Sequence, residues 1–223
     1  MNIKQVILGS NGAMGQALAG ELLKFSADIT LVSRSPQAVN SSDKLLALDL
    51  TLPANVERAI QDMDIVYITI GFAYRSSVWQ KLWFPFMESV IQSCIRHNAK
   101  LVFLGNIYAL GSNAVNHITE STPPQPTSKK GQVRAQVDQL LLSSIESGQL
   151  QGIIARAPDF FGGNSGVNSI MMSLVLFSPL MRELAEMNYQ FERDYFFDSS
   201  KFNEFFDYTP MSHAEAVKLA VQG

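Results

Sequence analysis

The sequence of 223 residues contains one cysteine and three histidines, and it has no long run of basic residues. A single cysteine excludes an internal disulfide, and the apolar, helical pattern around Cys94 predicts a buried, inert thiol. The histidines, His97, His117 and His213, lack the spacing of metal ligands, so we expect no metal site. A net charge of −3 without basic runs argues against nucleic acid as the main partner.

Long hydrophobic runs are also missing. No apolar stretch reaches the roughly 18 residues that indicate a membrane span, and the N-terminus lacks a basic region followed by an apolar core. We therefore expect a cytoplasmic protein with no membrane partner. A hydrophobic content of 47% in 223 residues is enough for the core of one α/β domain with a small annex.

A glycine-rich loop stands near the start of the chain, after a short apolar strand at residues 6–8. Gly9 permits the turn off the strand, Gly12 lets backbone amides approach a pyrophosphate, and Gly15 lets the next helix pack against the sheet. The amino end of that helix offers free N–H groups to phosphate. A turn without a ligand is the alternative. The residues expected at a dinucleotide are Gly9, Asn11, Gly12, Ala13, Met14 and Gly15.

Strand-like apolar segments alternate with helical patterns over two-thirds of the chain. We predict further strands at 29–32, 45–48, 65–70, 101–104 and 153–156, and helices at 53–61, 79–97 and 129–147. This alternation predicts an α/β fold, a doubly wound parallel sheet of the Rossmann type with helices on both faces.

We predict two parts: a dinucleotide-binding Rossmann domain at 1–165 and a small, mostly helical annex at 166–223. The annex is expected to contain helices at 169–188 and near 214–221, with methionines and aromatic residues in its core.

Four segments carry a resemblance to a known family: the glycine loop 9–15, the strand end 48–50, the loop end 118–124 and the stretch 156–162. Over residues 2–165 the chain resembles the extended branch of the short-chain dehydrogenase/reductase family, the nucleoside-diphosphate-sugar epimerases and dehydratases. The resemblance implies an NAD(P)-dependent enzyme acting on a small polar or anionic substrate. Since its relatives carry a longer substrate lobe, we expect a shallow pocket, or one completed by the second subunit of a homodimer.

The same resemblance implies further cofactor contacts. It places Asp49 beside the adenine ring with Leu50 next to it, and it adds Gly71 after the fourth strand. The Arg-Ala-Pro stretch that ends at Pro158 leads toward the nicotinamide and the substrate. For that stretch, the alternative is a plain strand end closed by a proline turn.

The residues after the second strand determine the choice of cofactor. NAD-binding relatives place an acidic residue there for the ribose hydroxyls, whereas a basic residue can receive a 2′-phosphate. This chain has Ser33 and Arg34, and its nearest acid, Asp28, is at the wrong end of the strand. Because Arg34 offers a charged fork suited to phosphate, we expect NADP, with NAD as the alternative. A solvated loop arginine is the other interpretation.

Relatives that transfer hydride use a tyrosine with a lysine four residues later on one helix face. Lys130 and Arg134 occupy the aligned positions here, so the usual pair is replaced. The serine usual after the fifth strand is absent as well. Asn106 could hydrogen-bond a carbonyl and Tyr108 could supply a displaced hydroxyl, although a turn asparagine and a packed aromatic are the alternatives. These four residues are the candidate catalytic positions.

Positive charge gathers at the start of one predicted helix, where it opposes the helix dipole. Lys129, Lys130 and Arg134 lie there, and no nearby carboxylate precedes residue 138 to compensate them. The functional interpretation is a contact with a phosphate or carboxylate. The alternative is a solvated helix end capped by Thr127 or Ser128.

The sequence therefore predicts an NADP- or NAD-dependent epimerase, dehydratase or reductase in which the usual Tyr-Lys pair is replaced. A competing hypothesis is a non-catalytic NADP(H) sensor, because the fold and the phosphate loop can persist without proton-transfer residues. A scaffold that acts only through partners is a third hypothesis, and it implies no cofactor affinity.

Overall fold

The computed structural model describes residues 3–25, 28–158, 186–190, 194, 196–212, 214–216 and 218. The chain forms two compact units. The first comprises Met1–Gly105 and Gln136–Arg156, and the second comprises Asn106–Ala135 and Ala157–Gly223. Helix α4 (Lys129–Glu146) runs from the second unit into the first. The domain boundary predicted between residues 165 and 166 lies outside the described residues.

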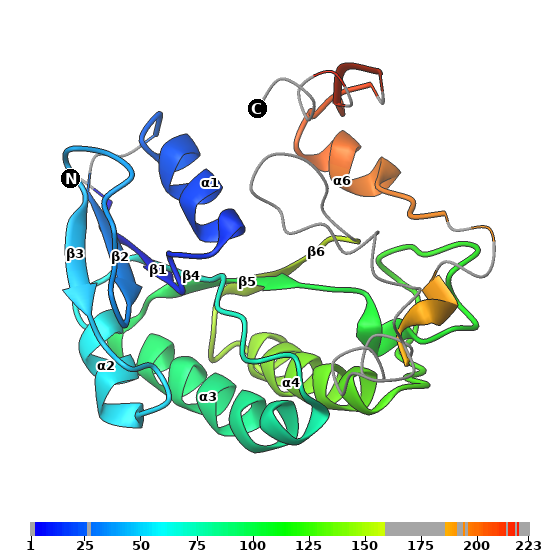
Figure 1. The fold of residues 1–223 in the computed structure, drawn as a ribbon, viewed down its shortest axis with the longest axis horizontal. Helices are drawn as coiled ribbons and strands as arrows, with labels where there is room; N and C mark the ends of the chain where they lie inside the picture. The colour runs from blue at the N-terminus through cyan, green and yellow to red at the C-terminus, as the bar shows by residue number, and fades with distance from the viewer. Residues whose placement is uncertain are drawn as a thin grey trace, which may run out of the picture. The chain divides into compact units, whose positions relative to one another are not determined.

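A parallel sheet of six strands forms the first unit (Figure 1), with the order β3-β2-β1-β4-β5-β6. All five strand pairings are parallel. The sheet confirms the predicted doubly wound Rossmann fold. The strands are β1 (Gln5–Leu8), β2 (Ile29–Ser33), β3 (Lys44–Ala47), β4 (Ile65–Ile68), β5 (Lys100–Gly105) and β6 (Gly152–Arg156).

Helices cover both faces of this sheet. Helix α1 (Ala13–Leu22) lies on one face, and α2 (Pro53–Ile60), α3 (Ser76–His97) and residues 136–146 of α4 lie on the other (Figure 1). Proline in the first turn of α2 suits a helix start, because no N–H partner is required there. Helix α3 ends at His97, and the next residue, Asn98, has a left-handed backbone and donates its N–H to carbonyls of the last turn.

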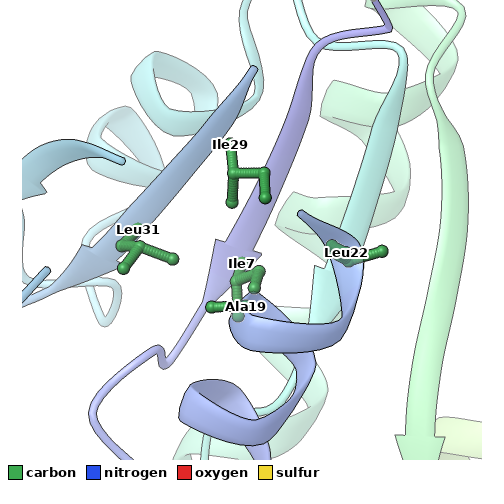
Figure 2. Packing of buried hydrophobic residues seen from close by; sticks show 5 residues of the cluster. All are labelled: Ile7, Ala19, Leu22, Ile29 and Leu31. Carbon is green, nitrogen blue, oxygen red and sulfur yellow. The ribbon is translucent and has the colours of Figure 1, made fainter. Parts of the chain in front are cut away.

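Apolar side chains fix α1 against the first two strands. Figure 2 shows a cluster formed by Ile7 of β1, Ile29 and Leu31 of β2, and Ala19 and Leu22 of α1. Burying an aliphatic side chain of this size contributes about 1.5–3 kcal/mol. The packing therefore holds the loop between β1 and α1 at the carboxyl end of β1.

A carboxylate ties α2 to α3. Glu57 accepts hydrogen bonds from Ser93 Oγ at 2.7 Å and pairs with His97 Nε2 at 2.8 Å and with Arg96. The Ser93 bond, followed by those of Arg96 and His97, lowers the pKa of Glu57 from 4.5 to about 2. Near these groups, Cys94 is fully buried, and burial raises its pKa to about 12. The predicted burial of the thiol is confirmed.

The second unit has its own small core of Ile107, Leu110 and Ile118. An isolated parallel bridge joins Ile118 to Phe197. Its described elements are η1 (Tyr108–Leu110), η3 (Asn188–Gln190) and α6 (Ser200–Phe205). The sequence did not predict α6. Most of the helix expected at 169–188 and part of the one expected at 214–221 lie outside the described residues.

None of the helices in the described part of the chain is both long and apolar enough to cross a membrane.

Candidate functional site

The glycine loop between β1 and α1 has two positions where the chain itself excludes a side chain. Gly9 has a φ of +98°, and a Cβ there would lie 2.4 Å from the Cα of Ile70. A Cβ at Gly15 would lie 2.7 Å from the Cα of Ser10. Both contacts are with backbone, which cannot move aside cheaply. Gly9 and Gly15 are therefore required for the loop and its helix to pack.

Gly12 differs from the other two glycines. Its φ is −73°, which any residue adopts, and the nearest atom to a Cβ would be Gly9 O at 3.8 Å. Gly12 is also the N-cap of α1, where no side chain caps the helix and no acidic residue stands in the first turn. The first turn, with Ala13 and Met14, therefore presents backbone N–H groups and the positive end of the helix dipole.

Ser10 is a loop residue that the sequence analysis did not single out. It is 1% exposed, and its Oγ makes no hydrogen bond to any described residue. Buried hydroxyls normally have a hydrogen-bond partner. The unpartnered Ser10 Oγ is therefore a second feature of the loop that fits a bound ligand. Ser10 is identified by its burial, which can be read only from the structure.

The end of β2 lies beside the glycine loop. Asn11 Nδ2 donates a hydrogen bond to the carbonyl oxygen of Ser35 at 2.7 Å. Ser33 Oγ accepts the N–H of Ser35 at 3.2 Å, which closes a short turn around the exposed Arg34. The structure thus brings Asn11, Ser33 and Arg34 together.

Asp49 follows β3 at the same edge of the sheet. Its Oδ1 accepts the N–H of Thr51 at 3.0 Å and the Thr51 hydroxyl at 2.8 Å. These bonds lower the pKa of Asp49, and the positive charge of Arg34 adds a smaller effect in the same direction. Leu50 is buried, and Gly71, after β4, has no atom within 4 Å of an added Cβ. Residues predicted separately after β1, β2, β3 and β4 therefore share the carboxyl edge of one sheet.

The remaining predicted site residues belong to the second unit: Asn106, Tyr108, Lys130, Arg134 and Pro158. Asn106 Oδ1 accepts the N–H of Tyr108 at 3.1 Å, which is a local turn bond. Tyr108 packs against the small core around Ile107. These contacts agree with the alternatives given above, a turn asparagine and a packed aromatic residue. The Asn106 amide and the Tyr108 hydroxyl stay candidates for contact with a substrate.

The start of α4 is built closely against Tyr108. A Cβ at Gly131 would lie 2.5 Å from the Tyr108 carbonyl oxygen and 2.9 Å from Ser128 Oγ. Ser128 Oγ accepts the N–H of Gly131 at 2.9 Å, so Ser128 caps the helix. The sequence analysis offered Ser128 as a cap of a solvated helix end. The structure has the cap, but the helix end is not solvated at Lys130, which is fully buried.

Glu186 is distant in sequence from α4 and pairs with a cation at its start: its Oε2 lies 4.0 Å from Lys130 Nζ. Asp138, on α4 itself, accepts a hydrogen bond at 2.7 Å from Nη2 of Arg156 on β6. Arg134, which is 6% exposed, lies on the same helix. This contact of Glu186 could not be predicted from a sequence pattern, because 57 residues separate it from the helix start that it contacts.

A hollow of about 580 Å³ lies at the opposite edge of the sheet, next to the amino ends of β1, β4 and β5. Its lining includes Lys4, Asp64, Cys94 and Lys100, and none of the predicted site residues. Ligands of parallel sheets bind at the carboxyl ends of the strands, so we assign no role to this hollow. Among the described residues, no group of three His, Cys, Asp or Glu side chains is placed to hold a metal.

Residues 5–178 match the model of the family described as the NAD dependent epimerase/dehydratase family. Among curated proteins, no sequence matches the chain.

Three solved structures illustrate the similarity. A putative epimerase from Burkholderia cenocepacia J2315 has a TM-score of 0.64 and 15% identity, over 78% of this chain and 59% of its own. A glucuronic acid dehydrogenase from Chromohalobacter salexigens gives 0.61 and 15%, over 73% and 62%. A UDP-glucuronic acid 4-epimerase from Bacillus cereus, solved with NAD, gives 0.59 and 19%, over 69% and 56%. At such identities the likeness shows the fold, and this chain spans less than two-thirds of each structure.

Proposed function

The chain belongs to the NAD dependent epimerase/dehydratase family, and we propose that it binds a nicotinamide dinucleotide and acts as an oxidoreductase, epimerase or dehydratase on a small polar substrate. One observation carries the proposal: Gly12 stands at the amino end of α1 although neither its φ nor its surroundings require glycine. A ligand that approaches the backbone closely would explain why residue 12 has no side chain. Pyrophosphate is such a ligand, because the amino ends of helices bind phosphate groups.

The residues around the loop fit such a ligand. The open N–H groups of the first turn of α1 would hold the pyrophosphate, and the Asp49 carboxylate would hydrogen-bond the adenosine part. When bound, the dinucleotide supplies or accepts a hydride. The Bacillus cereus structure described above contains NAD, which supports this class of cofactor for a chain of the same fold.

We propose NADP as the preferred form. Arg34 is exposed on the turn that Asn11 joins to the glycine loop, where the guanidinium can reach a 2′-phosphate. The Asp49 carboxylate, which the charge of Arg34 affects, has its Oδ1 engaged by Thr51. NAD binding without preference for the phosphate is the alternative outcome.

The proposed chemistry does not use the tyrosine and lysine of the family. Lys130 and Arg134 stand at those positions as buried cations, and a protonated lysine donates hydrogen bonds but accepts none. Lys130 would therefore act as a donor to a substrate oxygen. Asn106 and Tyr108 remain candidates for the neighbouring donor after β5.

A non-catalytic NADP(H) sensor is the second candidate. It is favoured by the ion pair of Lys130 with Glu186, which leaves the tyrosine position occupied by a cation that is already partnered within the chain. A sensor would bind the dinucleotide and turn over no substrate.

Calorimetric titration of NADPH and NADH into the full chain tests binding, and two assays test turnover: absorbance at 340 nm for net oxidation or reduction, and NMR of the substrate for epimerisation or dehydration, which leave the dinucleotide unchanged. The assay panel contains aldehydes, ketones, free sugars and UDP-sugars. Binding with turnover supports the enzyme, and binding without any turnover supports the sensor. Absence of binding by both dinucleotides contradicts both and leaves the scaffold hypothesis.

A further inference from the structure

Helix α6 (Ser200–Phe205; orange in Figure 1) has little packing to stabilise it. Of the residues from 200 to 212, only Asn203 is partly buried, and all the others are exposed. Isolated helices shorter than about 12–15 residues are marginal in water, and helices in proteins gain most of their stability by packing an apolar face. A helix of 6 residues that is exposed in this way therefore needs a further contact.

The exposed face of α6 is aromatic. Phe202, Phe205 and Phe206 recur at the spacing of three and four residues that places side chains on one side of a helix. The ring centroids of Phe202 and Phe206 are 4.7 Å apart, and those of Phe205 and Phe206 are 4.8 Å apart. The ring of Tyr208 lies 6.1 Å from that of Phe202. We call these four residues the aromatic patch. Large exposed apolar patches mark interaction sites.

The charges of α6 oppose the dipole of the helix. Lys201 stands in the first turn, where the helix end is positive, and Glu204 stands in the last turn, where the end is negative. Within the described part of the chain, neither side chain forms an ion pair. The carboxylate that precedes the helix, Asp198, is already engaged by Ser200 at 2.5 Å and by His117 at 3.5 Å.

A second copy of α6, packed antiparallel to the first, would reverse this unfavourable arrangement. The Lys201 end of each helix would then face the Glu204 end of the other, so that two ion pairs form about a two-fold axis. A surface that meets itself about such an axis has to be self-complementary in this way. The charges on α6 therefore fit a second copy of the same chain.

We propose that the aromatic patch is a self-association surface, on which the α6 helices of two copies of this chain pack antiparallel. Phe205, the most exposed of the four rings, is the main anchor. The proposal does not depend on the proposed function, because the patch contains none of the candidate site residues.

The exposed area suits a weak dimer. The four rings are 46–80% exposed, and an aromatic side chain has an area of about 150–250 Å², so each copy would contribute about 350–600 Å². Two copies would bury about 700–1,200 Å² from the rings alone, which lies at the low end of specific interfaces. We therefore expect a dissociation constant in the micromolar range.

A lipid surface fits the patch less well. Aromatic helices that lie on membranes carry an excess of basic residues, which anionic lipids attract. The segment 200–212 has one lysine against the two carboxylates of Glu204 and Asp207. Its charge therefore favours a protein partner over an anionic membrane.

Analytical ultracentrifugation of the full chain without dinucleotide, over about 1–200 µM, covers the expected range of dissociation constants. The average mass should rise from 24.7 kDa toward twice that value as the concentration increases. Phe205→Asp should raise the dissociation constant at least about hundredfold, because buried aromatic anchors dominate such contacts.

Phe25→Asp is the matched control for Phe205→Asp. The two phenylalanines are 83% and 80% exposed, but Phe25 belongs to the first unit and lies outside the aromatic patch. Phe25→Asp should leave the dissociation constant unchanged. Both variants should keep the circular dichroism spectrum of the unaltered chain, since both side chains are exposed.

Two charge variants test the antiparallel arrangement. Lys201→Glu and Glu204→Lys each bring like charges together across the two-fold axis, so each variant alone should associate at least about threefold more weakly. An equal mixture of the two should recover the association of the unaltered chain, because the new glutamate of one copy meets the new lysine of the other. An effect confined to one chain would not recover on mixing.

The proposal is overturned if the chain stays monomeric over the whole range, if Phe205→Asp leaves association unchanged, if Phe25→Asp weakens it equally, or if the mixture does not recover. A dimer that is lost in Phe84→Asp but kept in Phe205→Asp would place the contact on α3 instead. A monomer that sediments with vesicles of phosphatidylcholine and phosphatidylserine would assign the patch to lipid. If Phe205→Asp does not fold, the mixture of charge variants decides.

Discussion

Replacement of Gly12 by valine is the most informative single change in the glycine loop. A Cβ at Gly9 or Gly15 would collide with backbone at 2.4 or 2.7 Å, whereas the nearest atom to a Cβ at Gly12 lies 3.8 Å away. The φ of Gly12, −73°, also suits valine. Gly12→Val should therefore leave the strand and helix formed, whereas Gly15→Ala should displace α1 from the loop.

The expected change in stability is small for Gly12→Val. Replacing glycine removes freedom from the unfolded chain and stabilises by about 0.4–1 kcal/mol. A branched apolar residue at an N-cap costs a comparable amount relative to glycine. The net change is within about 1 kcal/mol, or roughly 2–4 °C in melting temperature for a chain of this size. Gly15→Ala should cost several times as much, because backbone must shift.

The effect on binding should be large. A hydrogen bond to a charged group contributes about 1.5–3 kcal/mol, so loss of one amide–phosphate contact weakens NADPH binding by about tenfold or more. Calorimetry gives the affinity, and circular dichroism and thermal melting give the state of the fold. Wild-type affinity in a folded Gly12→Val variant, or unfolding as severe as that of Gly15→Ala, would refute the reasoning.

Three further predictions concern charge. Arg34→Ala should weaken NADPH binding about tenfold or more and leave NADH binding unchanged; equal effects on both would remove Arg34 from the 2′-phosphate. Because the pKa of Glu57 is lowered on folding, its contribution to stability is complete above about pH 4.5 and is lost as the pH falls toward 2. Glu57→Gln should therefore flatten the acid side of the melting-temperature profile, and parallel profiles would contradict this. Lys130→Met should abolish turnover of any substrate found in the 340 nm assay while NADPH still binds; unchanged turnover would exclude Lys130 from the reaction.

Local patterns in the sequence were sufficient to predict the sheet. Short apolar runs and the helical segments between them identified the strands, because burial on both faces of a parallel sheet requires continuous apolar residues. Helix α3 begins at Ser76, earlier than the predicted 79. The resemblance linked Asp49 to the glycine loop, and the sheet places both at one edge.

The second unit was predicted less well, for a physical reason. Glu186 reaches Lys129 and Lys130 across 57 residues, and no periodicity encodes such a contact. For the cations at the start of α4, a ligand anion and a solvated helix end were the two interpretations, and in the structure Glu186 of the chain itself contacts Lys129 and Lys130. The burial of Ser10 Oγ could not be predicted from the sequence either, because it depends on packing. Helix α6 is short and has no preceding pattern beyond the Asp198–Ser200 turn.

The central claim is that the glycine loop holds a dinucleotide, and amide NMR of the chain labelled with ¹⁵N at glycine tests it most directly. On addition of NADPH, the signals of Gly9, Gly12 and Gly15 should move together and saturate, with the largest shift at Gly12. The signal of Gly148, at the far end of α4, should not move. Saturable NADPH binding that leaves all three loop signals in place would contradict the account.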